Sequence, residues 1–308
     1  MKLKRFSAVA VVAAVLGLGA CSSPKTELKL NFEKGKTYTY DYVTDLDMSM
    51  GGMVTKTAMD YSFNMEATPA ASGNTLLTTR IAHLKMKVGN AQMNLEVDTD
   101  HPVDTAGAAA DPMKMVSGMM SKVFGGMINK PLEVEINPKG SLVSIKGYNE
   151  MMTAVLDSIA TDSMQRMQMQ ATLDNQLNDD NLKGSFSQMF DFYPDHAVGK
   201  GDTWNRTLEV KGQMPMKMDM NYKVKEVKSD VVVLEVTGKL GTLGTGEQEI
   251  QGQKIKMEIS GTINGTMDVD AKSGMLHKGD LKQDFKVKMN DAMTLDMKGT
   301  TTFKGSVR

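Results

Sequence analysis

Methionine is the residue whose spacing in this chain could do chemistry. The stretch QMPMKMDMNYKV places methionine at every second position from 214 to 220, and Met-x-Met pairs recur at 48/50, 113/115 and 167/169. Thioether sulfur is a soft ligand that selects Cu(I). A copper site needs several sulfurs converging on one point, often with a histidine. Met275 and His277 are the one place where both residue types share a face of a predicted strand.

The wide distribution of the methionines argues against that copper site. The chain has 29 methionines, spread over many predicted strands, where they alternate with leucine, valine, tyrosine and phenylalanine. This pattern favours a soft apolar wall. A sink for oxidants is the remaining alternative, because surface methionine is readily and reversibly oxidised. We therefore predict no metal site and no cofactor, with Met275 and His277 as weak candidates for a metal.

Acidic residues and histidines give a second set of weak candidates. Asp98 and Asp100 open the stretch DTDHPVDTAGAAAD with a spacing that suggests an oxygen-rich calcium loop. The glycine and the bidentate glutamate that such a loop requires are missing, so a solvated loop is favoured. His196 lies near two aspartates in the sequence, but no serine elbow, HExxH motif or cysteine nucleophile accompanies it. We predict a non-catalytic protein without catalytic residues.

Cys21 is the most specific feature of the chain. It is the single cysteine, and it follows a basic start and an apolar run over 8–18 that is too short for a stable membrane span. The ending Leu-Gly-Ala-Cys resembles the lipobox of bacterial lipoproteins. This resemblance implies that residues 1–20 are a signal peptide and that 21–28 are a lipidated cysteine and its tether. The alternative is an ordinary secretory signal with a chance cysteine.

Charge and cysteine content limit the remaining possibilities. The formal net charge is −1, without the basic bias or stripe that a nucleic-acid partner would require, so we predict no nucleic-acid binding. A single cysteine allows no internal disulfide, so the core alone must hold the fold. The length is sufficient for one large or two modest domains. The oligomeric state stays open.

The elements that must position these residues are mostly strands. Polar and apolar residues alternate with period two in stretch after stretch, which is typical of half-buried antiparallel strands. We predict a mainly β, α+β fold: a curved antiparallel β-meander, half-barrel or sandwich-like, with central amphipathic helices. The candidate apolar face comprises Tyr38, Tyr40, Tyr42, Met59, Tyr61, Phe63, Met214, Met216, Met218, Met220, Met257, Met267 and Phe285.

The middle of the chain changes period. Helical spacing predicts an amphipathic helix from 148 to about 177 and a shorter one near 178–190. Asp-Pro at 111–112 predicts a helix over 112–124, and a hairpin is expected from 131–136 into 141–145. The predicted organisation is an N-terminal β half (29–147), a helical segment (148–195) and a C-terminal β half (196–308). The motifs EKGKTYTYDY and GKGDTWNRTL make two pseudo-repeats an option.

Several segments together resemble a known family. LKLNFEKGKTYTYDY, EINPKGSLVSIKGYNEM, a P-x-x-x-V-x-x-GDTW segment and MDVDAKSGMLHKGDLKQDF are similar to a Bacteroidota lipoprotein family known as a domain of unknown function. The resemblance covers nearly the whole chain after residue 20. It implies an exported lipoprotein of β-rich fold and brings no catalytic residues with it.

A sheet with one apolar face must cover that face. We expect a lipoprotein of the outer membrane, anchored through Cys21 and facing the periplasm, whose apolar face binds a lipid, another apolar ligand or a lipoprotein-like partner. The alternatives are a structural or interaction lipoprotein with a self-filled core and, second, a Met-rich Cu(I) binder. An apolar cavity of several hundred Å³ would favour ligand binding. Its mouth is expected beside Met214 and Met216, since Pro215 removes a hydrogen-bond donor there.

Overall fold

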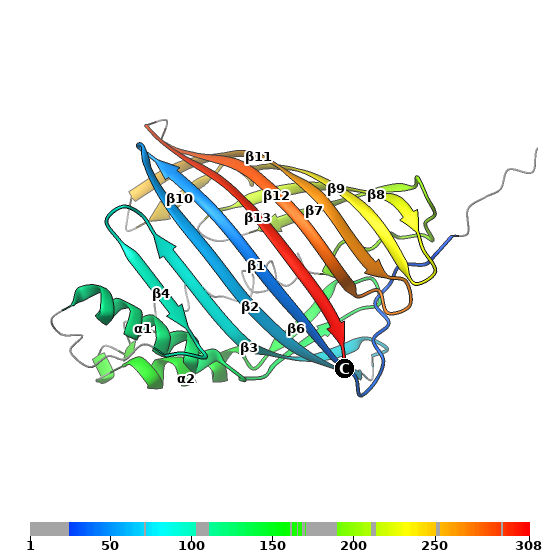
Figure 1. The fold of residues 1–308 in the computed structure, drawn as a ribbon, viewed down its shortest axis with the longest axis horizontal. Coiled ribbons are helices and arrows are strands. Elements are labelled where there is room, and N and C mark those ends of the chain that lie inside the picture. Colours follow the sequence, from blue (N-terminus) through cyan, green and yellow to red (C-terminus); the bar gives the residue numbers. More distant parts are fainter. Residues whose placement is uncertain are drawn as a thin grey trace, which may run out of the picture.

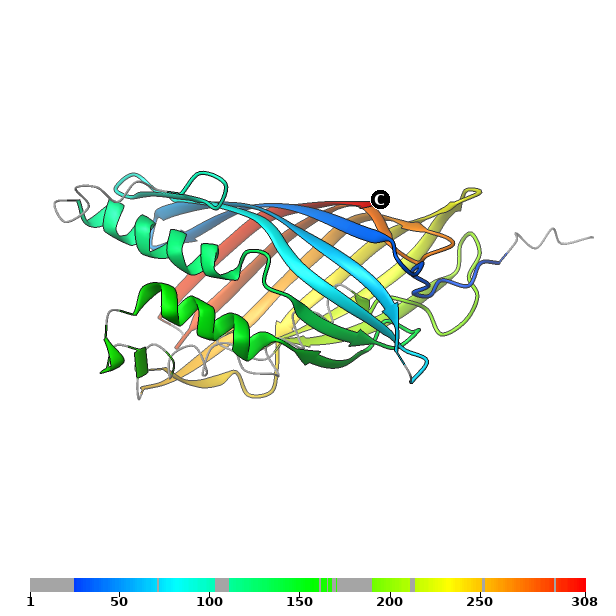
Figure 2. The ribbon, with the colours of Figure 1, turned by 90° about the horizontal axis from the view of Figure 1, so that it is seen from below.

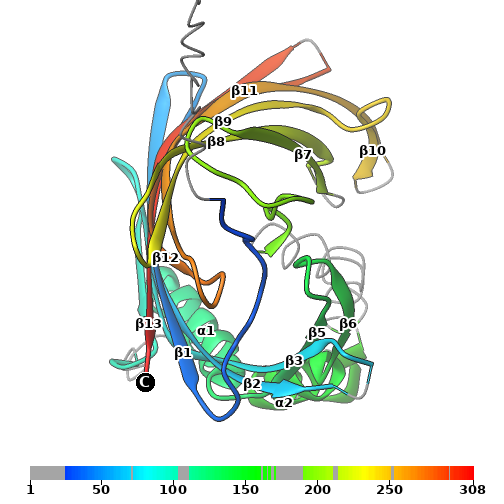
Figure 3. The same ribbon diagram turned by 90° about the vertical axis from the view of Figure 1, so that its right-hand side faces the viewer.

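One curved antiparallel sheet dominates the molecule (Figure 1). The computed structural model describes residues 25–70, 72–102, 111–160, 162–164, 166–167, 170, 190–210, 214–250, 253–290 and 292–308. Within these residues thirteen strands belong to the sheet, which curls into an open half-barrel (Figure 3). The predicted mainly β, α+β fold with a curved antiparallel sheet is confirmed.

Most strands pair with their neighbours in sequence, as in a meander, and the first strand also pairs with the last. The first half contributes β1 (Thr37–Met50), β2 (Met53–Pro69), β3 (Thr75–Gly89), β4 (Asn94–Asp98), β5 (Leu132–Ile136) and β6 (Leu142–Lys146). The second half contributes β7 (Thr203–Val210), β8 (Met216–Val227), β9 (Val231–Thr242), β10 (Glu247–Ile250), β11 (Gln253–Asp270), β12 (Leu276–Met289) and β13 (Met293–Val307). The spatial order is β6-β5-β3-β2-β1-β13-β12-β11-β9-β8-β7, with β4 beside β3 and β10 beside β11. Because β1 pairs with β13, the sheet is continuous across the two predicted halves.

Alternation sets the two faces of the sheet. On β1, Tyr38, Tyr40 and Tyr42 are buried, and the residues between them are half-buried or exposed. Inward-facing glycines let large side chains lie across neighbouring strands: a Cβ on Gly279 would lie 2.0 Å from Phe303 Cζ. Glycine in a strand marks such close approaches and helps a sheet bend.

Two helices pack against each other, and the first of them also packs against β4 (Figure 2). Helix α1 (Pro112–Met127) begins where predicted, with Asp111 Oδ1 accepting the backbone N–H groups of the second and third helical residues, Met113 and Lys114, at 2.9 and 3.2 Å. The predicted hairpin is confirmed as β5 and β6. In the described residues, no helix is long and apolar enough to cross a membrane.

Helix α2 (Tyr148–Ile159) is shorter than predicted. It ends at Ile159, because the backbone of the next residue, Ala160, is extended, with ψ 129°. Most of the remaining predicted stretch up to 177, and nearly all of the helix predicted near 178–190, lies outside the described residues.

The segment 25–36, here called the strap, crosses one end of the half-barrel (Figure 3). Thr26 and Val198 exchange two backbone hydrogen bonds of 2.8 Å. Further along, Leu30 N–H donates to Pro138 O (3.3 Å) and Asn31 N–H to Ser273 O (2.8 Å), in the turns after β5 and β11. Residues 25–28, assigned to the tether from the sequence, are thus part of the fold. We call this the closed end and the opposite one the open end.

Candidate functional site

An apolar cavity of about 610 Å³ lies between the inner face of the sheet and the two helices. Strands from both halves of the chain line it, while Met127 of α1 and Met151 of α2 contribute from the helical side. Phe192, in the buried segment behind the strap, lines it as well. The cavity therefore depends on all three parts of the predicted organisation.

Most of the apolar face predicted from the sequence lines this cavity. The residues concerned are Tyr42, Tyr61, Phe63, Met216, Met218, Met220, Met267 and Phe285. Met214 stands at the open end, next to the lining residue Met216, with 37 % of its surface exposed. β8 begins directly after Pro215, as the second strand from the β7 edge of the sheet.

The other predicted residues lie elsewhere in the fold. Tyr38, Tyr40 and Met257 are buried in the core outside the lining, and Met59 is half-buried on β2. The strap explains the position of Tyr38, because its hydroxyl accepts the Glu33 N–H at 2.7 Å. Phe32 adds a ring contact of 4.4 Å to Tyr38. Tyr38 therefore belongs to the packing of the closed end, whereas Met257 pairs with Met289 beside the β12–β13 turn at the opposite end.

An aromatic cluster forms one wall of the cavity. Tyr42 and Tyr61 are direct partners on β1 and β2, and their rings stack at 5.2 Å. Phe63 meets both rings edge-on, at 6.0 and 5.3 Å. Burial raises the pKa of the Tyr42 and Tyr61 hydroxyls above the ordinary value of a tyrosine, so both stay uncharged at neutral pH.

Sequence reasoning missed the polar part of the lining, which consists of Thr44, Thr79, Gln283 and Thr301. Thr44 Oγ1 and Thr301 Oγ1 lie 3.2 Å apart, one on β1 and the other on β13. Strand parity could have found Gln283, because it stands between Leu281 and Phe285 on the inward face of β12. Among the described lining residues none carries a formal charge.

Asp98 and Asp100, the weak acidic candidates, gather with His83 at the β3–β4 hairpin. His83 Nδ1 lies 2.8 Å from an Asp100 oxygen, and the three side chains offer ligand atoms within 4.8 Å of one another. Asp98, however, already accepts a 2.8 Å hydrogen bond from Lys85 Nζ. That hydrogen bond holds the pKa of Asp98 well below its usual range. The ammonium group thus balances the buried carboxylate, and the arrangement is that of a hairpin ion-pair network.

Met275 and His277 do not share surroundings. Met275 is buried and His277 is exposed, because β12 begins between them at Leu276. The aspartates near His196 have other partners. Asp195 pairs with Lys139 and Arg206 at 3.3 and 3.2 Å, and Asp202 accepts the Gly199 N–H.

Structural comparisons find distant likenesses. A lipovitellin structure, described as lipid-protein interactions in lipovitellin, shares 9% identity at a TM-score of 0.45, covering 90% of this chain and 26% of that chain. This chain therefore spans about a quarter of lipovitellin. The translocator domain of the autotransporter NalP from Neisseria meningitidis shares 8% sequence identity at a TM-score of 0.34, and the match covers 90% of both chains. Pseudomonas aeruginosa OpdQ shares 7% sequence identity at a TM-score of 0.23, and the match covers 90% of this chain and 100% of that chain. Likenesses this distant say nothing about function.

Family comparison is more informative. A search of curated proteins finds no match. Residues 72–276, which run from the β2–β3 turn to the start of β12, match the model of a family of unknown function, DUF6263. The match spans more than half of the chain and includes both helices and most of the cavity-lining strands. This chain belongs to the DUF6263 family, whose function is unknown.

Proposed function

We propose that this protein is a non-catalytic lipoprotein of the cell envelope that binds an apolar ligand inside the half-barrel. The observation that carries this proposal is the cavity of about 610 Å³. Small-molecule sites typically measure roughly 300–1,000 Å³ and are lined mainly by apolar groups. Protein interiors that serve only as cores pack densely and leave few voids larger than a water molecule. The cavity thus favours ligand binding over a self-filled core.

Methionine suits the wall of such a site. Its unbranched side chain has several rotatable bonds and a polarisable sulfur, so it repacks around ligands of different shape. Met216, Met218 and Met220 line the cavity from β8. Valine or isoleucine would present a stiffer surface, because branching at Cβ restricts the first side-chain torsion. The choice of residue therefore favours a site that adapts to its occupant.

Membrane attachment is the second part of the proposal. The lipobox-like ending at Cys21 supports lipidation and delivery to the outer membrane, facing the periplasm. Lys25, the first described residue, lies four positions after Cys21, a span of at most about 14 Å. Lys25 belongs to the closed end, where its Nζ lies 3.4 Å from an Asp202 oxygen. Lipidation would therefore hold the closed end near the bilayer.

The cavity is tested with an uncharged dye, N-phenyl-1-naphthylamine, whose fluorescence rises in apolar surroundings. A chain beginning at Ser22 lacks the lipid and retains every residue that the structure describes. We expect saturable dye binding. Leu281→Trp, which adds bulk inside the cavity, should weaken it by roughly tenfold or more, a loss of about 1.4 kcal/mol.

Lys282→Trp is the matched control, because the neighbouring side chain is exposed and does not line the cavity. It should bind the dye like the unmodified chain, and thermal unfolding of both variants checks that they fold. An unmodified chain that binds no dye would support the self-filled core instead. Stoichiometric Cu(I) binding in a parallel titration, without dye binding, would favour the metal alternative.

A further inference from the structure

Uncharged polar side chains form a row across the inner face of the sheet. Thr44 on β1 and Thr301 on β13 are direct partners, and Thr301 faces Leu281 on β12. Gln283 is the next inward residue of β12. We call Thr44, Thr301 and Gln283 the polar row. It lies in the middle of strands that are otherwise apolar on this face.

The Gln283 amide is open to the cavity. The residue opposite Gln283 on β13 is Gly299, which has no side chain that could cover the amide. In the part of the chain that the structure describes, its side chain forms no hydrogen bond with the protein, although it lines the cavity. The hydroxyls of Tyr42 and Tyr61, one inward position closer to the closed end, likewise have no hydrogen-bond partner among the described residues. A polar group left unpaired in apolar surroundings is costly unless water or a bound molecule satisfies it, so a ligand that displaces water from the cavity must offer these groups a hydrogen bond.

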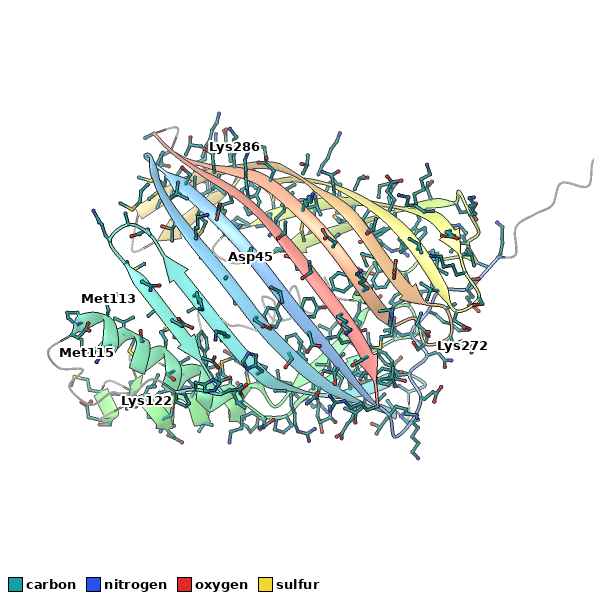
Figure 4. The ribbon with its side chains drawn as sticks, in the orientation of Figure 1. Asp45, Met113, Met115, Lys122, Lys272 and Lys286 are labelled. Carbon is teal, nitrogen blue, oxygen red and sulfur yellow. The ribbon has the colours of Figure 1, made fainter. Side chains whose placement is uncertain are left out.

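Charged side chains of the same strands point the other way. Asp45, Lys282 and Asp284 alternate with the inward residues and are exposed, and Asp284 pairs with Lys298 at 3.3 Å. Figure 4 shows Asp45 and Lys286 on the outer face. A carboxylate or phosphate inside the cavity would therefore find no cation among the described lining residues. A charge buried without a partner is far more costly than a neutral polar group.

We propose that the ligand of this cavity is an uncharged amphiphile, whose one neutral hydrogen-bonding group, such as a hydroxyl, ester or amide, lies on the polar row while its hydrocarbon part fills the Met- and Phe-lined remainder. This inference rests on the proposed function. A volume of about 610 Å³ corresponds to about twenty water-sized groups of about 30 Å³ each, which is enough for one chain or ring system.

The titratable residues of the lining are all neutral at ordinary pH, so none of them can balance the charge of an anionic ligand. Tyr42, Tyr61 and Tyr222 are the titratable residues among those described in the lining. Burial raises the pKa of each hydroxyl above the ordinary value. The described lining therefore keeps its charge state across the neutral range, and a pH effect on binding reports the ligand.

Displacement of the dye by a matched pair of probes tests the ligand class. Dodecanol and dodecanoate share one hydrocarbon chain and differ in the charge of the head group. At about pH 8.5, where the carboxylic acid is ionised in water, dodecanol should displace the dye at an at least tenfold lower concentration. Displacement by dodecanoate should improve as the pH falls, because protonation makes the acid neutral.

Variants of the polar row separate specificity from folding. Gln283→Leu and Thr301→Val should each weaken dodecanol binding roughly three- to tenfold more than they weaken binding of the dye to the same variant, the loss of about one hydrogen bond. Thr300→Val, on the opposite face of β13, should change neither. Dodecanoate that equals dodecanol at high pH, or probes that fail to displace a bound dye, would overturn the neutral-ligand inference alone. A chain that binds no dye overturns the proposed function as well.

Discussion

At the scale of single residues, methionine occurs in two different surroundings, buried and exposed. Met218 and Met220 each expose 6 % of their surface and line the cavity, whereas Met50, Met53 and Met293 expose 45, 51 and 47 % at turns of the open end. Thioether oxidation requires access, so exposure determines its rate. A methionine that faces a ligand site should in addition become slower to oxidise when the site is filled.

We therefore predict that hydrogen peroxide oxidises the open-end methionines first, at a rate that dodecanol does not change. Met218 and Met220 should react more slowly, and saturating dodecanol should slow them further. Met65, buried at 1 % outside the cavity lining, is the control and should stay slow under both conditions. Peptide mass spectrometry measures each site. Equal protection of Met53 and Met218 by dodecanol would contradict a ligand in the cavity.

Strand parity could predict the inward face but not its division between core and cavity. Tyr40 and Tyr42 have the same parity, yet only Tyr42 lines the cavity. Tyr40 lies nearer the closed end, where the strap adds Leu28 and Leu30 to the hydrophobic core. The strap is held there by backbone hydrogen bonds to Pro138, Val198 and Ser273, which are distant in sequence and which no local period encodes. Gln283 was missed for the opposite reason, since one polar residue on an apolar face looks like an interruption of the pattern.

At the scale of elements, local periods predicted what each segment becomes, but not where it lies. The Asp111 cap and the β5–β6 turn could be predicted because their hydrogen-bond partners lie within a few residues in the sequence. The pairing of β1 with β13 was not, since it joins the two ends of the chain. The end of α2 at Ile159 was missed as well, because helical spacing continues beyond it in the sequence.

The strap is the element whose contribution is easiest to isolate. Leu30 is buried, and Lys29 beside it is exposed. Leu30→Ala should lower the free energy of unfolding by about 2–5 kcal/mol, the usual cost of removing a buried leucine side chain. Lys29→Ala should stay within about 0.5 kcal/mol of the unmodified chain. Urea unfolding measures both. Equal stabilities would show that the strap does not hold the closed end.

At the scale of the whole molecule, the position of the strap would determine how the half-barrel is oriented relative to the membrane. The turns after β5, β8 and β11 lie at the closed end with Lys25, and the turn between β12 and β13 lies at the open end. β1 has 14 residues, a length of about 46 Å at about 3.3 Å per residue. A lipid on Cys21 would thus hold the closed end against the bilayer and the open end far from it.

Fluorescent labels on single cysteines test this orientation. The proposed lipidation would block Cys21, the single cysteine of the chain, so that Ser229→Cys at the closed end and Thr294→Cys at the open end each add one reactive thiol. In vesicles with a quencher on the lipid head groups, the label at position 229 should be quenched strongly and the label at 294 weakly. Cys21→Ser should abolish membrane binding and both effects. Stronger quenching at 294 would reverse the orientation, and binding that survives Cys21→Ser would show that the lipid is not the anchor.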